Sequence, residues 1–599
     1  MSQEHISRVG GELFSDPGPD GTLARGFLRG TGLSRDDIAD RPVIGIANTW
    51  SELNPCNGGL RDVAEHVKRG IVAAGGLPLE FPTISLAEPF VRPTSLYLRN
   101  LMAMDVEETI RASPIDGVVL LGGCDKTIPA LLMGAFSAGK PALAVAAGPR
   151  PLSCWRGEPM TVENFWPIID ERRSGVLDDA GWREFESQVS CGVGTCNVMG
   201  TATTMAVITE VLGMSLPGSS LAGAGTEERS GIAERTGRLI VARALAGRSP
   251  ADIVDASALH DAFRAVCAVG GSTNAVIHLL AFAGRLGIPL DASVLRELSE
   301  TTPFLVDVRP SGEGFLHEVE ADGGIPALMH QLGDLVNLDR LAGDDRPWRE
   351  SVAPPRRDGG TIGSRTEPKG PVGAIGLVSG TLAPDGAVVK LSAASPDLLS
   401  HTGRAVVFDG VEDLRSRIDS PGLEVDASSV LVLRGVGPVG GLGMPEVGHL
   451  PIPARLLAEG VTDMVRVSDA RMSGTASGTV ILHVAPEAAI GGPLALVRDG
   501  DPIRFDAASH RIDLLVADDE LAHRRADLRI EPVPCRGYER LYRDHVLQAD
   551  AGCDFDFLRA DGVSAGDVRV DGASTVGDRT VDRAAADPDS DPERTEQPA

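Results

Sequence analysis

Lysine is scarce in this chain. Of the 56 basic residues among 599, five are lysine and the remaining 51 are arginine. Only a lysine amine can lose its proton and become a nucleophile or a modified ligand, so a lysine kept beside other reactive groups is a candidate for chemistry. Lys126 is that candidate, because it stands in the run Gly-Gly-Cys-Asp-Lys-Thr at 122–127. The competing interpretation is an ordinary surface lysine.

The sequence also lacks the marks of membrane, secreted and nucleic-acid-binding proteins. It has no run of ~18 apolar residues, so we expect no membrane span. The opening stretch MSQEHISRVGGELFSD has neither the basic start nor the apolar core of a secretory signal, so we expect a cytoplasmic protein. A formal net charge of −28 argues against a nucleic-acid partner. A chain of 599 residues is too long for one core, which predicts two or more domains.

Cysteine is sparse, and no Cys-x-x-Cys pair occurs among the eight cysteines. This argues against a disulfide scaffold, a zinc ribbon and a thioredoxin motif, and leaves free, catalytic or metal-bound thiols. Cys56, Cys124 and Cys196 each lie in a glycine-rich polar turn, whereas Cys267 in AVCAVGG is expected to be a small buried apolar residue.

The first part of the chain, residues 1–342, is predicted to be an α/β domain with a mainly parallel sheet. Short apolar runs at 42–49, 116–123 and 141–148 indicate buried strands, and helical patterns beginning at 59 and at 95 separate them.

Ligands of such folds bind beyond the carboxyl ends of the strands, and Cys56 and Cys124 both follow a predicted strand. Cys196 precedes a helical pattern at 197–214, whose dipole would stabilise a thiolate.

The composition changes after residue 342. Residues 343–370 are rich in Pro, Gly and charge and predict a linker. Residues 371–574 are dominated by strand patterns, including a hairpin from 502 to 516, and predict a β-rich, barrel-like or sandwich domain. The end, 575–599, is acidic and low in large apolar residues, so we expect a disordered tail.

Six stretches of this sequence, in this order, carry a family resemblance: NPCNGG, GGCDKTIPALLMGA, GTCNVMGTATTMA, VGGSTNAVIHLLA, GMPEVGHLP and SDARMSGTASGTVILH. The chain resembles the dihydroxy-acid and sugar-acid dehydratases over residues 10–560. GTCNVMGTA, SDARMSGTA and HVLQADAGCDFDFL are most similar to the sugar-acid branch, which includes pentonate dehydratases for arabinonate and xylonate. One position departs from the pattern: Gly59 stands where the family often has His.

The resemblance implies an iron–sulfur cluster held by Cys56, Cys124 and Cys196. Such clusters are normally bound by four thiolates, so three would leave one iron open as a Lewis acid. The sugar-acid branch suggests [2Fe–2S], and [4Fe–4S] remains open. Cys191 is a competing ligand, because it lies five residues before Cys196.

The resemblance also implies a magnesium site made by Glu88, Asp125, Lys126 and Glu446. Magnesium prefers hard oxygen donors, and an ammonium is the wrong ligand for it. The family solves this by carbamylating the lysine with carbon dioxide, which supplies a carboxylate.

The family's proton acceptor matches Ser473, acting as an alkoxide that a nearby cation must stabilise, and Thr475 matches a residue that hydrogen-bonds near the substrate. The loop GGSTNA at 270–275 lacks the spacing and the lysine of a phosphate-binding loop, so we interpret it as a turn that shapes the site. Lys390 is a second retained lysine, which could bind the substrate carboxylate.

These residues imply a dehydratase that converts a 2,3-dihydroxy sugar acid into a 2-keto-3-deoxy acid and water. Ser473 would remove the C2 proton while the two metals bind the acid end and the C3 hydroxyl. We expect a small-molecule substrate and a homodimer or homotetramer. A dihydroxy-acid dehydratase of branched-chain amino-acid synthesis and a non-catalytic iron–sulfur sensor remain alternatives, although a sensor has no use for the acids, the lysine and the serine together.

Overall fold

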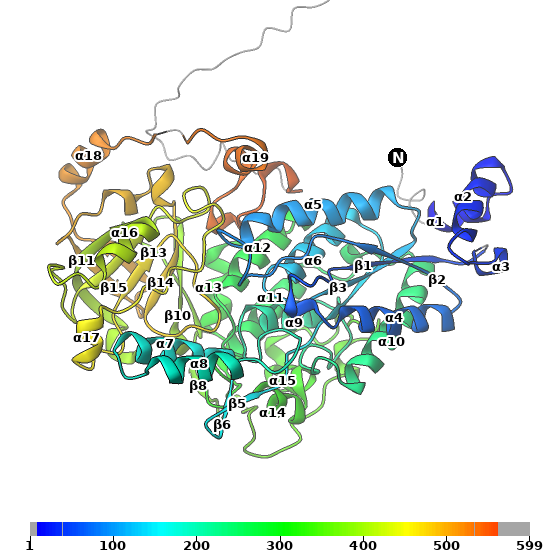
Figure 1. Ribbon diagram of the computed structural model, residues 1–599, viewed down its shortest axis with the longest axis horizontal. Helices are drawn as coiled ribbons and strands as arrows, with labels where there is room; N and C mark the ends of the chain where they lie inside the picture. Colours follow the sequence, from blue (N-terminus) through cyan, green and yellow to red (C-terminus); the bar gives the residue numbers. More distant parts are fainter. Residues whose placement is uncertain (1–8, 39, 532, 561–599) are drawn as a thin grey trace, which may run out of the picture.

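The computed structural model describes residues 9–38, 40–531 and 533–560, and the predicted tail lies outside them (Figure 1). Helices of the first half of the chain are α1 Val9–Ser15, α2 Pro19–Arg29, α3 Arg35–Ile38, α4 Leu60–Ala73, α5 Leu96–Ala112, α6 Thr127–Ala138, α7 Phe165–Arg173, α8 Asp179–Gln188, α9 Thr201–Val211, α10 Glu227–Leu245, α11 Ala256–Ala268, α12 Asn274–Leu286 and α13 Ala292–Glu300. The later helices are α14 Leu316–Ala321, α15 Gly324–Leu332, α16 Gly410–Arg417, α17 Ala454–Ala458, α18 Asp518–Asp527 and α19 Gly537–His545.

A parallel sheet forms the centre of the N-terminal domain, as the apolar runs predicted. Its strand order is β2-β1-β3-β4, with β1 Val43–Asn48, β2 Leu77–Pro82, β3 Gly117–Gly122 and β4 Ala142–Ala146. Successive side chains of a strand point to opposite faces. Ile44 and Ile46 of β1 therefore pack with α4 and α10, whereas Val43 and Ala47 pack with α5 and α6. Both faces are covered, which is why these strands are continuously apolar.

The C-terminal domain is a strongly curved mixed sheet. Its eight described strands run in the order β16-β15-β11-β12-β13-β14-β10-β9. The two outer strands meet, because Ser379, just after β9, bridges to Arg511 of β16. The nearly closed arrangement agrees with the predicted barrel-like domain. These strands are β9 Ile375–Val378, β10 Gly386–Lys390, β11 Ser400–Asp409, β12 Val430–Arg434, β13 Arg466–Ser468, β14 Val480–Ala485, β15 Pro502–Asp506 and β16 Arg511–Leu514.

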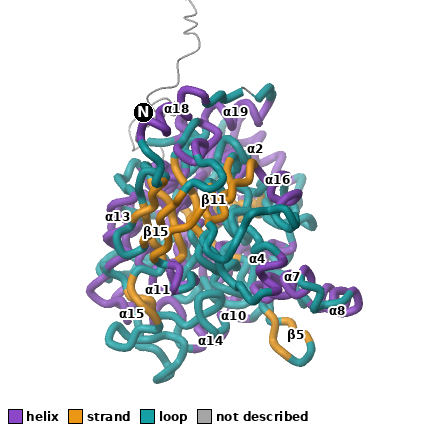
Figure 2. The backbone as a smooth tube through the Cα atoms, turned by 90° about the vertical axis from the view of Figure 1, so that its left-hand side faces the viewer, coloured by secondary structure: helices purple, strands orange, loops and turns teal. Residues whose placement is uncertain are grey.

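Short strands complete the description: β5 Ser153–Trp155 pairs with β6 Glu158–Met160, and β7 Pro303–Phe304 pairs with β8 Gly370–Val372. The hairpin β5–β6 and helices α7 and α8 form an excursion at the edge of the molecule (Figure 2).

Segments of each domain pack on the other. Helix α7, between β6 and α8, lies beneath the C-terminal strands in Figure 1, where Arg173 forms an ion pair of 3.0 Å with Asp419. In the opposite direction, the segment that follows α19 returns to the N-terminal domain, where Arg285 and Arg99 bind Asp554 and the Gly552 carbonyl. The two domains are therefore held together by two sets of contacts, one made by α7 and the other by the segment after α19.

Two local predictions differ from the structure. Residues 343–370, predicted as a linker, pack along the N-terminal domain, with Trp348 fully buried and the Lys369 amide bonded to the Phe304 carbonyl at 2.9 Å. The helix expected from 197 begins at Thr201. Residues 197–200 form a loop instead, because Asn197 accepts from the Val162 amide and the Met199 amide donates to the Arg309 carbonyl. No helix within the described ranges is long and apolar enough to cross a bilayer.

Candidate functional site

Three cysteine loops meet beyond the carboxyl end of the parallel sheet. Cys56 lies in the short helical turn after β1, and Cys124 lies between β3 and α6 with a left-handed φ of 65°. A positive φ is strained for cysteine and is typical of functional turns. The Cys196 loop joins them, since the Gly194 amide donates to the Pro55 carbonyl at 3.2 Å.

Gly123 lets the three loops approach one another. A Cβ at this position would lie 2.8 Å from Asn57 Oδ1 and 3.0 Å from Thr195 Cγ2, and these two residues are the chain neighbours of Cys56 and Cys196. A side chain cannot be accommodated at such distances without a shift of the loops. The glycine next to Cys124 is thus a geometric requirement for bringing the cysteines together.

We expect Gly123→Ala to separate the cysteine loops. The added methyl should lower stability by ~1–3 kcal/mol, the usual effect of overpacking, and should reduce the iron bound per chain. Melting temperature and iron content measure the two effects. Gly26→Ala is the matched control, because a Cβ there meets no atom within 4 Å of it among the described residues. Full iron content in the Gly123 variant would contradict the packing argument.

The thiols influence one another directly. Cys124 donates a hydrogen bond to Cys56, which lowers the pKa of Cys56 against the effect of burial, and the charge of Arg150 adds to the lowering. The same hydrogen bond and burial raise the pKa of Cys124. Burial, followed by the negative charge of Cys56, raises the pKa of Cys196. The helix starts at Thr201, five residues later, so Cys196 does not lie at its first turn as expected.

Lys126 stands beside Cys124 among three carboxylates. Its Nζ is 3.8 Å from Glu88 Oε2, 3.7 Å from Asp125 Oδ2 and 3.6 Å from Glu446 Oε1. The side chain is fully buried, yet Nζ makes no hydrogen bond to any residue that the structure describes. Buried polar groups are normally satisfied, so this amine requires an explanation. The interpretation of Lys126 as an ordinary surface lysine is therefore wrong.

The carboxylates around Lys126 differ in how strongly they are held in the ionised form. Burial raises the pKa of Glu88, but Lys126, Arg471 and the Ser95 and Thr94 hydroxyls outweigh it, so the pKa falls to about 2. Burial, and then Glu88, raises the pKa of Glu446 to about 7. Burial also raises the pKa of Asp125. Three largely buried acids at one point disfavour each other's ionised form, which a further cation would stabilise.

Sequence reasoning missed Arg471 and Asn274, which tie this cluster to the C-terminal domain. Arg471 Nη1 donates to Glu446 Oε1 and to Asn274 Oδ1, both at 2.9 Å. Asn274 Nδ2 in turn donates to the Met472 carbonyl at 3.2 Å, next to Ser473. Both residues lie inside stretches that carry the family resemblance, and this is the sequence signal that could have identified them.

Ser473 lies in a hydrogen-bonded chain that begins at Trp166. The indole Nε1 donates to Thr475 Oγ1 at 2.9 Å, and Thr475 Oγ1 is 2.8 Å from Ser473 Oγ. An indole N–H can only donate, so the Thr475 oxygen accepts from it and its own hydrogen is available for Ser473. The Thr475 amide also donates to Ser473 Oγ at 3.3 Å. The Thr475 hydroxyl and amide therefore both face the Ser473 oxygen.

The other positions of interest lie around this centre. Cys191 is exposed and its thiol donates to the Leu152 carbonyl at 3.1 Å. A Cβ on Gly59 would contact Val193 at 3.6 Å, an ordinary distance. The loop 270–275 supplies Asn274 and so contributes to the site, as the interpretation of a shaping turn predicted.

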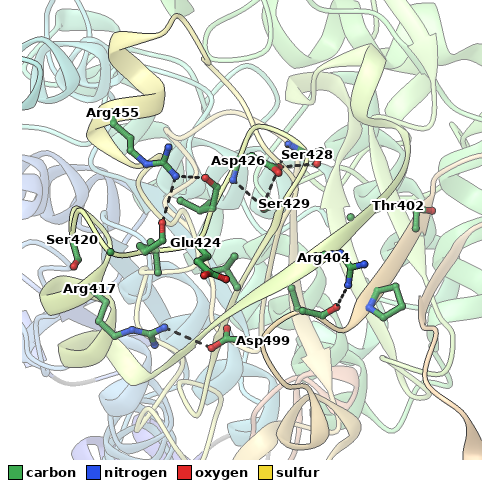
Figure 3. Close-up of a pocket in the computed structure, with 18 residues that line it drawn as sticks. Thr402, Arg404, Arg417, Ser420, Glu424, Asp426, Ser428, Ser429, Arg455 and Asp499 are labelled. Atoms are coloured by element: carbon green, nitrogen blue, oxygen red, sulfur yellow. Dashed lines mark hydrogen bonds and ion pairs between the residues drawn. The ribbon is translucent and has the colours of Figure 1, made fainter.

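A separate cavity of about 1100 Å³ lies in the C-terminal domain and shares no lining residue with the cluster above (Figure 3). Its three arginines are engaged: Arg404 donates to the Gly500 carbonyl, Arg455 to the Val425 carbonyl, and Arg417 lies 3.8 Å from Asp499. All three arginines thus have hydrogen-bond or ion-pair partners within the wall.

Within the described residues, no three His, Cys, Asp or Glu side chains form by themselves a group that could hold a metal ion. The donor sets nevertheless fit the groups that the resemblance implies. A cluster spans several atoms, so its thiolates need not surround one point. At the lysine, carbamylation changes the charge by −2 and a magnesium ion adds +2, so the site's overall charge is preserved. The amine without a hydrogen bond is the atom that would be modified.

The structure thus places thiols, acids, a lysine and a serine together where the two domains meet. The chain belongs to the dihydroxy-acid/6-phosphogluconate dehydratase family, since its N-terminal model matches residues 41–351 and its C-terminal model residues 360–553. It is accordingly a dehydratase, a hydro-lyase. The first match ends and the second begins inside the segment 343–370.

Relatives of known name cover almost the whole chain. A 6-deoxy-6-sulfo-D-gluconate dehydratase of Pseudomonas putida is 45% identical over 89% of this chain and 93% of its own length. An L-arabonate dehydratase of Azospirillum brasilense is 46% identical over 91% and 96%. A dihydroxy-acid dehydratase of Pyrococcus abyssi is 36% identical over 89% and 97%.

Proposed function

We propose that this enzyme dehydrates a sugar acid, converting a 2,3-dihydroxy aldonate into a 2-keto-3-deoxy acid and water. The observation that carries the proposal is the buried Lys126 amine, without a hydrogen bond to any described residue, among three carboxylates and beside three clustered cysteines. The higher identity to two sugar-acid dehydratases than to a dihydroxy-acid dehydratase favours a hydroxylated substrate.

The proposed cofactors are a [2Fe–2S] cluster on Cys56, Cys124 and Cys196, and a magnesium ion on Glu88, Asp125, carbamylated Lys126 and Glu446. When bound, these groups supply two Lewis acids, one for the acid end of the substrate and one for the C3 hydroxyl. Arg471 holds Glu446 in place, and the Thr94 hydroxyl holds Glu88 at 2.7 Å.

The protein's own part in the reaction is to move a proton and to orient the group that takes it. Ser473 Oγ accepts the proton from C2, and the Thr475 hydroxyl and amide stabilise the serine oxygen before that transfer. The C3 hydroxyl leaves and is released as water once it has gained a proton. The enol that remains tautomerises to the 2-keto-3-deoxy acid, so the atoms balance without an oxidant or reductant.

A panel of substrates tests the proposal. Purified holoenzyme is offered pentonates, hexonates, a 6-sulfo hexonate and the short apolar 2,3-dihydroxy-3-methylbutanoate, and 2-keto acid formation is measured. We expect kcat/KM for at least one aldonate to exceed that for the short acid by ~100-fold or more, because hydrogen-bonding sites reject substrates that lack the matching hydroxyls. A preference for the short acid would instead identify a dihydroxy-acid dehydratase.

We further propose a homodimer or homotetramer. Leu23 and Phe27, four residues apart on α2, are 61% and 73% exposed and form an apolar face that a second copy could cover. Sedimentation equilibrium gives the assembly state directly.

A further inference from the structure

Two buried side chains of opposite charge have no part in the mechanism above. Lys390, the last residue of β10, is 1% exposed, and its Nζ makes no hydrogen bond to any described residue. Glu163 lies in the short helical turn Val162–Asn164, and its Oε2 is also buried without a hydrogen bond in the described chain. Unsatisfied buried charged groups are costly and are retained where a ligand completes them.

Glu163 is held between the two catalytic loops. Its neighbour Val162 donates from the amide to Asn197 Oδ1 at 3.1 Å, next to Cys196. Three residues beyond Glu163, the Trp166 indole donates to Thr475 at 2.9 Å, in the Ser473 loop. The turn that carries Glu163, together with the start of α7, therefore reaches from the cysteine loop to the serine loop.

Lys390 reaches the same region from the C-terminal domain. Ala393, three residues later, accepts from the Gly478 amide at 2.8 Å, so the end of β10 packs against the loop 473–479. Ser392 Oγ lies 3.1 Å from Ser311 Oγ, which donates to the Gly270 carbonyl at the start of loop 270–275. Lys390 and Glu163 thus converge on the domain interface from opposite sides.

The two side chains also influence each other electrostatically. Burial lowers the pKa of Lys390 to about 8, and Glu163 is the charged group that opposes this. Burial raises the pKa of Glu163. The positive charges of Arg309 and Lys390 oppose this rise, and the negative charge of Glu313 adds to it. Arg309 and Glu313 pair with each other at 3.4 Å, so the four charges sum to zero.

We propose that Lys390 and Glu163 form the subsite for the distal hydroxyls of the substrate, and that this subsite selects a neutral polyol end over a second anionic group. The proposal rests on the proposed function. An ammonium donates up to three hydrogen bonds and a carboxylate accepts several, which matches hydroxyls that do both. A sulfonate or phosphate at the same place would be attracted by Lys390 but repelled by Glu163, so it loses the advantage that a lysine alone would give it over a neutral hydroxyl group.

This assignment differs from the expectation that Lys390 binds the substrate carboxylate. The proposed magnesium ligands lie around Lys126. The carboxylate whose charge opposes the lowering of the Lys390 pKa is Glu163 and not one of those ligands. The acid end of the substrate therefore belongs at Lys126 and the hydroxylated end at Lys390.

The test compares two substrates in the holoenzyme: the best aldonate of the panel and 2,3-dihydroxy-3-methylbutanoate, which has no distal hydroxyl. Lys390→Met removes the ammonium and keeps the length of the chain, and Glu163→Gln keeps the shape of the acid. We expect the ratio of kcat/KM for the aldonate to that for the short acid to fall by about 30-fold in Lys390→Met and about 10-fold in Glu163→Gln, since each loses a hydrogen bond to a charged group. The 6-sulfo substrate should gain relative to the aldonate in Glu163→Gln.

Lys140→Met is the matched control. Lys140 is also largely buried, but it donates to the Ser113 carbonyl at 3.0 Å, away from the loops above. Its replacement should leave the substrate ratio as in the wild type. Equal losses on both substrates in Lys390→Met and Glu163→Gln would mean a structural role and overturn the subsite. A wild type that prefers the short acid would instead overturn the proposed function, and the subsite with it.

Discussion

Ser473→Ala is expected to lower kcat by ~10³ or more, within the range that general-base catalysis supplies. The change removes one oxygen, and the loop keeps its contacts, since the backbone bond from Ala476 to the Ser473 carbonyl at 3.1 Å does not involve the side chain. Iron content, magnesium content and melting temperature should stay close to the wild type. Exchange of the C2 proton with deuterated solvent should disappear together with turnover, because both require the same proton transfer.

Ser477→Ala is the control for that experiment. Ser477 is exposed in the same loop, and its hydroxyl has no part in the chain from Trp166 to Ser473. Retention of more than a tenth of kcat by Ser473→Ala, a barrier change under ~1.4 kcal/mol, would exclude Ser473 as the base. Glu88 and Glu446 would then be the next candidates.

Lys126→Arg is expected to abolish turnover and magnesium binding although it conserves the positive charge. A guanidinium remains charged and cannot form a carbamate, so the −2 change in charge that offsets a divalent cation is lost. Arginine is also larger than the fully buried side chain it replaces. Magnesium per chain, turnover, and the carbamate signal after exposure to ¹³C-labelled bicarbonate measure the outcome.

Lys68→Arg is the matched control for Lys126→Arg. Lys68 is partly exposed on α4 and pairs with Glu65 at 2.7 Å and Glu80 at 2.5 Å, contacts that arginine can reproduce. The Lys68→Arg variant should bind magnesium and turn over substrate as the wild type does. Wild-type turnover in Lys126→Arg would show that Lys126 is no ligand, and a carbamate signal in that variant would refute the assignment of the modified atom.

The parallel sheet and the proximity of two cysteine loops could be predicted because both depend on local patterns. The apolar runs at 42–49 and 116–123 became β1 and β3, and parallel strands end at the same edge of a sheet. Cys56 and Cys124 therefore had to lie near each other despite their separation along the chain. The hairpin in the C-terminal domain, β15–β16, was predicted for the same local reason.

The prediction that a helix begins at 197 was wrong, because contacts with residues distant in sequence hold 197–200 as a loop. These residues have helical periodicity, but the bonds from Val162 to Asn197 and from Met199 to Arg309 hold them as a loop. Propensity is a weak preference that such contacts override. The linker predicted at 343–370 shows the same effect, since Trp348 is fully buried despite its polar neighbours.

The sequence by itself determined the family, the parallel and barrel-like domains, and the residue types available for chemistry, because local patterns and short motifs encode these. Only the tertiary structure decided that Arg471 and Asn274 bind Glu446, that Trp166 orients Thr475, and that Lys390 and Glu163 are buried without a hydrogen bond to any described residue. Each of those contacts joins residues more than twenty positions apart. Their formation depends on how distant segments pack within and between the domains, which no single segment encodes.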